Sequence, residues 1–159
     1  MAQRGKLSAL TTIASKVNTG FIKPLWDRDA KKMSGFNAFI QANMANVDEL
    51  GAIDYGRLVA SKGKMSAPAG LSAGIANGDV TVQFSTDILD SYGLASNKVY
   101  AFLLNSETGE VYLSAGIATR SAGAVTFEDT GITVEGYYVF VAFRRADGSM
   151  TSNSAIWEA

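Results

Sequence analysis

The side chains that could do chemistry in this sequence are carboxylates, hydroxyls and amines, because its 159 residues include neither Cys nor His. Their absence excludes thiol nucleophiles, disulfides, histidine bases, Ser-His-Asp triads and zinc sites built from thiolate or imidazole ligands. Ser/Lys dyads, carboxylate pairs and metal sites with oxygen ligands stay open. Most familiar active sites are therefore missing, and we expect no enzyme, no cofactor and no small-molecule substrate.

Three pairs of acidic residues are the remaining candidates for carboxylate chemistry or a metal: Asp27 with Asp29, Asp87 with Asp90, and Glu128 with Asp129. The first pair lies at a predicted helix start, where acidic side chains interact favourably with the helix dipole, so capping is the favoured role. The other two lie in a loop and at a strand end, without the Asp-x-Asn-x-Asp-Gly pattern of a calcium loop. An enzyme with a carboxylate mechanism is therefore the least favoured function.

The composition is that of one globular module, with 47% hydrophobic and 18% charged residues. Residues 1–16 only superficially resemble a signal peptide, because Ser8, Thr11 and Thr12 dilute the apolar stretch and Lys16 follows it. No window approaches the ~20 apolar residues that span a bilayer. We expect no membrane partner, and a location in the virion if the protein is phage-encoded and otherwise in the cytoplasm.

Charge is distributed unevenly along the chain. Residues 1–64 carry ten Lys/Arg against five Asp/Glu, and residues 65–159 carry four against ten, so the two parts are +5 and −6. The basic part could dock on an acidic partner, on its own acidic domain or on nucleic acid, or it could be an ordinary solvated surface. Nucleic acid is not expected, because Lys31-Lys32 is the only adjacent basic pair there and no recognition motif accompanies it.

Residues 1–64 are predicted to form a basic helical arm. Apolar residues at three- and four-residue steps predict a helix from Asp27 to Val47, capped by Ser34 or Asp27 and ended by Gly51. The apolar stripe of this helix comprises Met33, Phe36, Ile40, Met44 and Val47. A weaker helix is predicted from Leu7 to Val17. Gly, Ser and Pro in residues 61–70 predict a connector between the arm and the rest of the chain.

Residues 65–159 are predicted to form an immunoglobulin or fibronectin type III-like β-sandwich of seven or eight strands, so the fold class is mainly β. Turn signals separate the apolar runs at Asn77-Gly78, Thr108-Gly109, Ala122-Gly123 and Asp147-Gly148. The expected strands are Leu71 to Ile75, Asp79 to Ser85, Lys98 to Asn105, Glu110 to Ala115, Ile117 to Arg120, Ala124 to Glu128, Tyr137 to Arg145 and Met150 to Trp157.

Two of these strands are apolar on both faces. If Val99 and Val139 point into the sandwich, five large side chains point outward together on neighbouring strands: Tyr100, Phe102, Leu104, Tyr138 and Phe140. Leaving each in water would forgo roughly 1.5 to 3 kcal/mol, so the outer face needs a cover. The favoured cover is the helical stripe with Met33, Phe36 and Ile40, and the alternative is a partner chain.

The residues also resemble a known family. Three segments carry the likeness: Met33 to Phe39 with Asn43, Ile53-Asp54-Tyr55 leading to Ser61-Lys62-Gly63, and Val141 to Phe143 followed by Ala146-Asp147-Gly148 and Ser152-Asn153-Ser154. They resemble an uncharacterised domain family of Bacteroidota with a helical amino-terminal segment and a fibronectin-like sandwich. The resemblance covers about residues 20–157 and implies a setting in Bacteroidota genomes or their phages. It implies no catalytic residue.

The features together favour a non-enzymatic structural protein of a phage or prophage particle, an accessory or decoration protein of the capsid, neck or tail. Its partners would be other virion or assembly proteins, and we expect an oligomer in that context. The alternative is an exported surface or periplasmic module that recognises glycan or protein through sandwich loops and the aromatic residues Tyr92, Tyr112 and Trp157. The polar segment Ser149 to Ser154 could serve that role or form an ordinary strand face.

Overall fold

The computed structural model describes residues 2–28, 30–133 and 135–158. The helical part contains α1 (Ala2–Val17), a π-helical turn η1 (Asn18–Ile22), α2 (Lys23–Trp26) and α3 (Gly35–Asn43), followed by the short 3-10 turns Met44–Asn46 and Tyr55–Arg57. The strands are β1 (Ser72–Ala76), β2 (Asp79–Gln83), β3 (Lys98–Asn105), β4 (Val111–Thr119), β5 (Ala124–Phe127), β6 (Tyr137–Arg144) and β7 (Ala155–Glu158). A 3-10 turn, Arg120–Ala122, joins β4 to β5.

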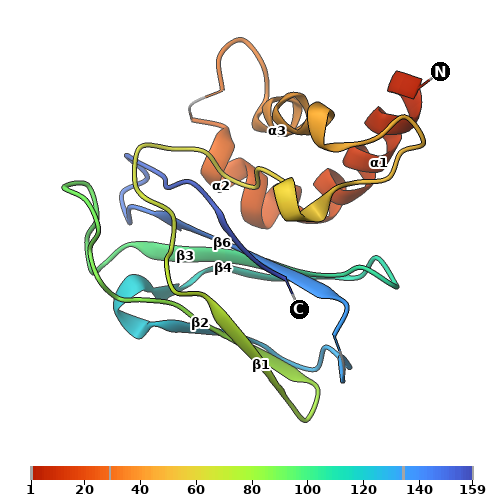
Figure 1. The fold of residues 1–159 in the computed structure, drawn as a ribbon. Helices are drawn as coiled ribbons and strands as arrows, with labels where there is room; N and C mark the ends of the chain where they lie inside the picture. Colours follow the sequence, from red (N-terminus) through yellow and green to blue (C-terminus); the bar gives the residue numbers. More distant parts are fainter. Residues whose placement is uncertain (1, 29, 134, 159) are drawn as a thin grey trace.

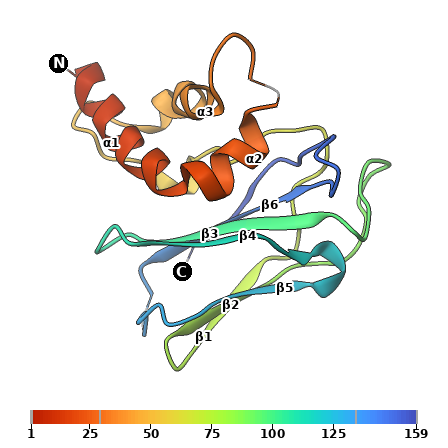
Figure 2. The same cartoon turned by 180° about the vertical axis from the view of Figure 1, so that it is seen from behind.

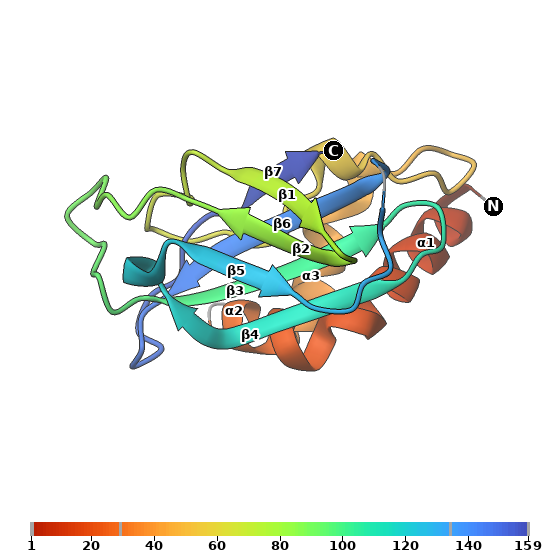
Figure 3. The same ribbon diagram turned by 90° about the horizontal axis from the view of Figure 1, so that it is seen from below.

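The seven strands of the described residues form two antiparallel sheets, in the orders β1-β2-β5 and β4-β3-β6-β7 (Figure 3). The predicted mainly β architecture is therefore confirmed. Alternation places one side of each strand between the sheets, where an apolar core forms around Val82, Leu103, Val139 and Phe143. The helices cover the other face of the four-stranded sheet, so the molecule has three layers (Figures 1 and 2).

Most strands match the predicted bounds to within two residues, and the prediction differs further at two places. The two strands expected on either side of Gly116 are one strand, β4, in which the pairing with β3 shifts and Gly116 adopts a φ of 70°. A bulge lets one strand continue through an irregularity that looks like a break in the sequence. The last strand begins at Ala155 rather than Met150, because Thr151 and Ser152 form only isolated bridges, to Arg144 and Met65.

The helix predicted from Asp27 to Val47 is wrong in its length. Residues 27, 28 and 30–34 lie outside any helix, and α3 begins only after Ser34, whose hydroxyl accepts a hydrogen bond from Asn37 N at 3.1 Å. Asp27 Oδ1 accepts from Gly35 N at 2.9 Å, so both predicted caps act on the same helix start. The helix ends at Asn43 rather than at Gly51.

The layer over the sheet contains more of the chain than the predicted stripe. Phe36 and Ile40 of the stripe belong to the same apolar core as Phe102, but other helical segments lie nearest to the sheet backbone. The π-helical turn packs against β3 and β4, with α1 beside β4, whereas α3 packs mainly on α1, η1 and α2. Gly20 permits the close approach, since a Cβ there would lie 3.3 Å from Leu113 Cδ1. The weaker helix, predicted from Leu7 to Val17, is therefore part of the layer that covers the sheet. Its apolar residues Leu10, Ala14 and Val17 are fully buried.

The connector predicted at residues 61–70 is built into the sandwich. Ser61 Oγ donates to Ser152 O at 2.7 Å, and Met65 N donates to Thr151 O at 3.2 Å. Both Ser61 and Met65 are buried, and Met65 belongs to the core between the two sheets. Hydrogen bonds therefore fix the segment that joins the helical layer to the sandwich against the chain just before β7.

Candidate functional site

The sheet residues proposed for docking lie under the helical layer of the same chain. Phe102, Leu104 and Phe140 are buried in the core that α1, η1 and α3 form with the four-stranded sheet, and Tyr100 and Tyr138 are partly buried against it. The Phe102 ring stacks on Phe140 with centroids 4.6 Å apart. It also meets the edge of the Phe21 ring at 4.8 Å. The three buried side chains have almost no accessible surface, and the two tyrosines keep a part of theirs.

The three arm residues of the docking set are placed differently from one another. Ile40 is buried in this core, and Phe36 packs against it while partly buried. Met33 is 39% exposed, because it precedes the start of α3 and lies outside any helix. Met33 therefore does not lie with the other residues of the apolar stripe to which the sequence pattern assigns it.

The three aromatic residues named for the alternative binding function also differ in how far they are exposed. Tyr112 packs on the sandwich core and its hydroxyl donates to Glu110 Oε2 at 2.7 Å, which raises the pKa of the phenol. Trp157 packs on the same core. Tyr92 is 41% exposed in the loop between β2 and β3. Of the three, Tyr92 is the most exposed.

Residues 87–94 of this β2–β3 connection, called the apolar loop below, gather large hydrophobic side chains on the surface. The exposed fractions are 50% for Ile88, 54% for Leu89, 41% for Tyr92 and 46% for Leu94. Exposed apolar residues that occur singly are ordinary, but four within seven positions are the composition of an interaction patch. The apolar loop is the candidate functional site.

Asp90 holds the apolar loop in one conformation. Its carboxylate accepts hydrogen bonds from Ser66 N at 2.6 Å and from Tyr92 N and Gly93 N at 2.9 Å each. The bonds to Ser66, first from the N–H and then from the hydroxyl, lower the pKa of Asp90, and the other two N–H groups add to the effect against the opposing cost of burial. The loop is therefore tied to the start of the sandwich by an ionised side chain.

Two arginines hold the backbone of the apolar loop in place through hydrogen bonds to its carbonyl groups. The buried Arg120 donates from Nη1 to Asp87 O at 3.1 Å and from Nε to Asn97 Oδ1 at 3.2 Å, and its guanidinium carbon lies 4.0 Å from the Phe143 ring centroid. Burial lowers the pKa of Arg120, and the Asp90 carboxylate opposes this shift. Arg145 Nη2 donates to Tyr92 O at 3.0 Å. A loop fixed in this way loses little conformational entropy when it binds.

The variant Asp90→Asn is expected to remove part of the loss of stability in acid. Because the folded pKa of Asp90 lies below the unfolded value of about 3.9, the ionised carboxylate stabilises the chain above that pH, and this contribution is lost as the pH falls through the folded pKa. Tm measured between about pH 7 and pH 2 should fall less for the variant than for the natural chain. Equal acid profiles for the two chains would contradict the role given to Asp90, and Asp87→Asn in the same loop is the control.

A hollow of about 420 Å³, called the Trp26 hollow below, lies on the helical layer. Its lining comprises Leu25, Trp26, Ala30, Lys31, Met33, Ala38, Gln41, Ala42 and Lys62. Trp26 is held in place because its indole N–H donates to Ala60 O at 2.7 Å and its ring meets the edge of Phe39. The hollow therefore has an apolar wall in a fixed position and two lysines in its lining.

The acidic pairs singled out in the sequence have different places in the structure. Asp27 caps α3, and Asp29 lies outside the described residues. Glu128 and Asp129 are exposed at the end of β5. Within the described ranges no group of three or more acidic side chains is arranged to hold a metal ion, and no helix is long and apolar enough to cross a membrane.

Periodicity does not reveal the apolar loop. Ile88, Leu89, Tyr92 and Leu94 follow neither the two-residue nor the helical period, so no pattern groups them as a face. The available signal is the coincidence of large apolar residues with the turn-forming Asp87, Asp90 and Gly93. Large apolar residues in a segment that must be a loop predict exposure, and several of them close together have the composition of an interaction patch.

The fold and this surface define a class of protein: a two-sheet antiparallel sandwich, capped by helices, that displays a braced apolar loop. The chain belongs to the family of unknown function DUF6266, whose model matches residues 1–157. The resemblance to an uncharacterised family agrees with this membership. No curated protein matches the chain.

One solved structure is similar to part of the chain. The spore cortex lytic enzyme SleM of Clostridium perfringens matches with 13% identity and a TM-score of 0.37, over 60% of this chain and 28% of that one. The chain thus spans less than a third of that protein's length. A likeness of this strength carries no conclusion about the fold or activity of the present chain.

Proposed function

We propose that this protein is a non-enzymatic structural protein that acts by protein–protein assembly. The observation that carries the proposal is the apolar loop, whose four exposed hydrophobic side chains sit on a backbone fixed by Asp90, Arg120 and Arg145. Burying one such side chain in an interface is worth up to about 1.5–3 kcal/mol. A fixed loop of this kind supplies the apolar centre of a contact, with polar residues around it.

The proposed sandwich type is that of immunoglobulin or fibronectin type III domains. The sheet orders β1-β2-β5 and β4-β3-β6-β7 support this type, because each sheet joins strands that are distant in sequence, as Greek-key connections do. In such sandwiches the loops at the two ends carry recognition, and the apolar loop is one of these end loops. The sandwich would serve as the rigid support, and residues 1–64 as a helical layer that closes its outer face.

At the next level of detail we propose an accessory or decoration role in a phage or prophage particle of a Bacteroidota host. Particle symmetry repeats every contact, so a modest interface centred on one loop becomes strong by multivalency. The proposed partners are other virion or assembly proteins, and the proposed location is the virion if the protein is phage-encoded and otherwise the cytoplasm.

The test is incorporation into particles. Particles purified by density gradient from the producing culture are expected to contain the chain in many copies, and Leu89→Asp is expected to reduce the number of copies several-fold. Leu50, which is 94% exposed and lies far from the loop in sequence, gives the matched control Leu50→Asp, expected to incorporate normally. Absence of the natural chain from particles would overturn the proposed role.

An exported module that recognises glycan or protein is the second candidate, and the exposed Tyr92 ring favours it. An aromatic ring at a sandwich end is a suitable platform for a sugar face or a peptide. This candidate predicts export and binding to a glycan array that is lost in Tyr92→Ala. Detection in the cytoplasm alone, with no glycan bound, would eliminate it.

A further inference from the structure

The apolar loop combines exposed aliphatic side chains with negative charge. Ile88 and Leu89 lie between Asp87 and Asp90, and residues 87–94 contain no Lys or Arg. Asp90 keeps its charge because its carboxylate accepts three backbone hydrogen bonds. The charge of Asp90 is offset by Arg120, whereas Asp87 forms no ion pair among the described residues. A surface that fits this part of the loop is apolar where it meets Ile88 and Leu89 and positively charged where it meets Asp87.

The Trp26 hollow has both properties. Trp26 and Met33 contribute apolar surface, and Met33 is partly exposed in its lining. Lys31 and Lys62 supply two exposed positive charges, and no acidic residue is part of the described lining. A volume of about 420 Å³ accommodates two aliphatic side chains.

We propose that the apolar loop of one copy of this chain docks in the Trp26 hollow of a second copy. The inference rests on the proposed assembly function and names the partner. Ile88 and Leu89 enter the hollow beside Trp26 and Met33, which removes apolar surface of both copies from water. Asp87 then faces the lysines of the hollow, and this charge pairing fixes the orientation and excludes a loop-to-loop contact.

The positions of the two features allow the contact to be reciprocal. Arg28, in the segment that borders the hollow, donates from Nη1 to Gly148 O at 2.8 Å. From the same turn, Arg145 donates to Tyr92 O in the apolar loop. α2, which contributes Trp26 to the hollow, and the β2–β3 connection accordingly lie in the same half of the molecule, away from the start of α1 (Figures 1 and 2). A two-fold axis between them gives a dimer in which each copy contributes one loop and one hollow.

Sedimentation velocity of the full-length chain over a range of concentrations tests this contact. The natural chain is expected to form dimers, and Leu89→Asp is expected to raise the dissociation constant at least about tenfold. The control Leu50→Asp should leave it unchanged. Asp87→Lys and Lys31→Asp should each weaken the dimer, whereas the double variant should recover most of the lost affinity because the charge pair is restored in reverse.

Three outcomes would overturn the inference: a natural chain that stays monomeric, equal weakening by Leu89→Asp and Leu50→Asp, or no recovery in the double variant. A monomer that binds phospholipid vesicles through Leu89 would assign the loop to a lipid surface instead. A monomer that is nevertheless present in particles would overturn only the copy-to-copy contact. A dimer that behaves as expected but is absent from particles would overturn only the proposed role.

Discussion

Replacing Phe102 with Ala is expected to lower the free energy of unfolding by about 3–5 kcal/mol, within a single cooperative transition. The Phe102 ring is fully buried between the helical layer and the sheet, in contact with Phe21 on one side and Phe140 on the other. Its removal leaves a cavity that neither layer can fill alone, because the surrounding side chains come from both.

Urea denaturation followed by tryptophan fluorescence checks the size of the effect and its cooperativity. Trp26 reports on the helical layer and Trp157 on the sandwich, so variants that keep one Trp each follow the two parts separately. Ile117→Ala, at an 85% exposed position of the same sheet, is the control and should change stability by less than about 0.5 kcal/mol. If Phe102→Ala shifted the Trp26 signal and left the Trp157 signal in place, the two parts would be independent domains.

The sandwich could be predicted from the sequence because its signals are local. The central strands β3 and β6 are apolar on both faces, and this pattern correctly implies that a second layer covers the outer face. The turn at Asn77-Gly78 is predictable as well, since both residues adopt positive φ, of 53° and 83°. Register irregularities are not predictable in this way, because the bulge at Gly116 depends on the neighbouring strand.

The helical layer could be predicted only in outline. A stripe of apolar residues shows that a helix is buried but not everything it is buried against. The sequence pattern places Phe36 and Ile40 over the sheet, but it does not show that α3 also packs on α1 and α2. The helix with the weaker signal, predicted from Leu7 to Val17, is part of α1, and α1 and η1 lie closer to the sheet. The Gly, Ser and Thr residues of α1 lower the intrinsic helix propensity, and packing compensates for that loss.

The candidate site depends on contacts that no local pattern reveals. The apolar loop is braced by Ser66, Arg120 and Arg145, which lie 24, 33 and 53 positions from their partners in the loop. The sequence shows that residues 87–94 form a loop with Asp90 in it. It does not show that Asp90 is tied to Ser66 N, which makes an otherwise mobile loop a fixed surface.

Replacing Asn43 with Leu is expected to cost roughly 2–4 kcal/mol of stability, although Leu is apolar and similar in size. The fully buried Asn43 amide uses all of its hydrogen-bonding capacity. Its Nδ2 donates to Phe39 O and to Val59 O, both at 2.9 Å, and its Oδ1 accepts from Val59 N at 2.7 Å. In the variant both backbone groups of Val59 lose their partners, because this segment has no strand beside it.

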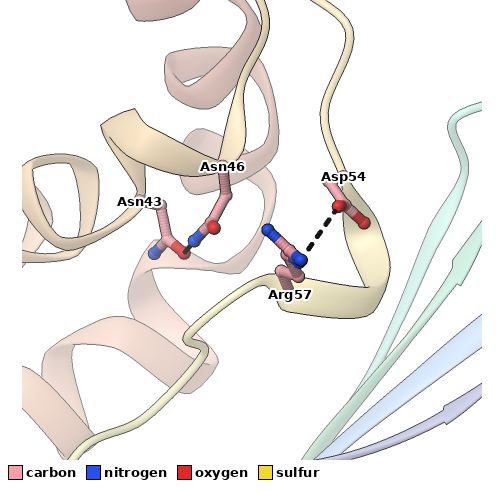
Figure 4. A network of polar contacts seen from close by, with 4 residues as sticks. All are labelled: Asn43, Asn46, Asp54 and Arg57. Atoms are coloured by element: carbon pink, nitrogen blue, oxygen red, sulfur yellow. Dashed lines mark hydrogen bonds and ion pairs between the residues drawn. The ribbon is translucent and has the colours of Figure 1, made fainter.

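The neighbouring polar contacts provide the controls for Asn43. Asn46 donates to Asn43 Oδ1 at 3.2 Å, while Arg57 and Asp54 form a separate exposed ion pair at 3.6 Å (Figure 4). Asn46→Ala should cost about 1 kcal/mol or less, and Arg57→Ala close to nothing, because an exposed pair contributes little. Urea denaturation of the three variants should therefore rank Asn43→Leu far above the others. Equal losses of unfolding free energy in Asn43→Leu and Asn46→Ala would contradict this role of Asn43. The segment at Val59 would then be held by the apolar contacts of Leu58 and Ala60, and the buried amide would only fill space.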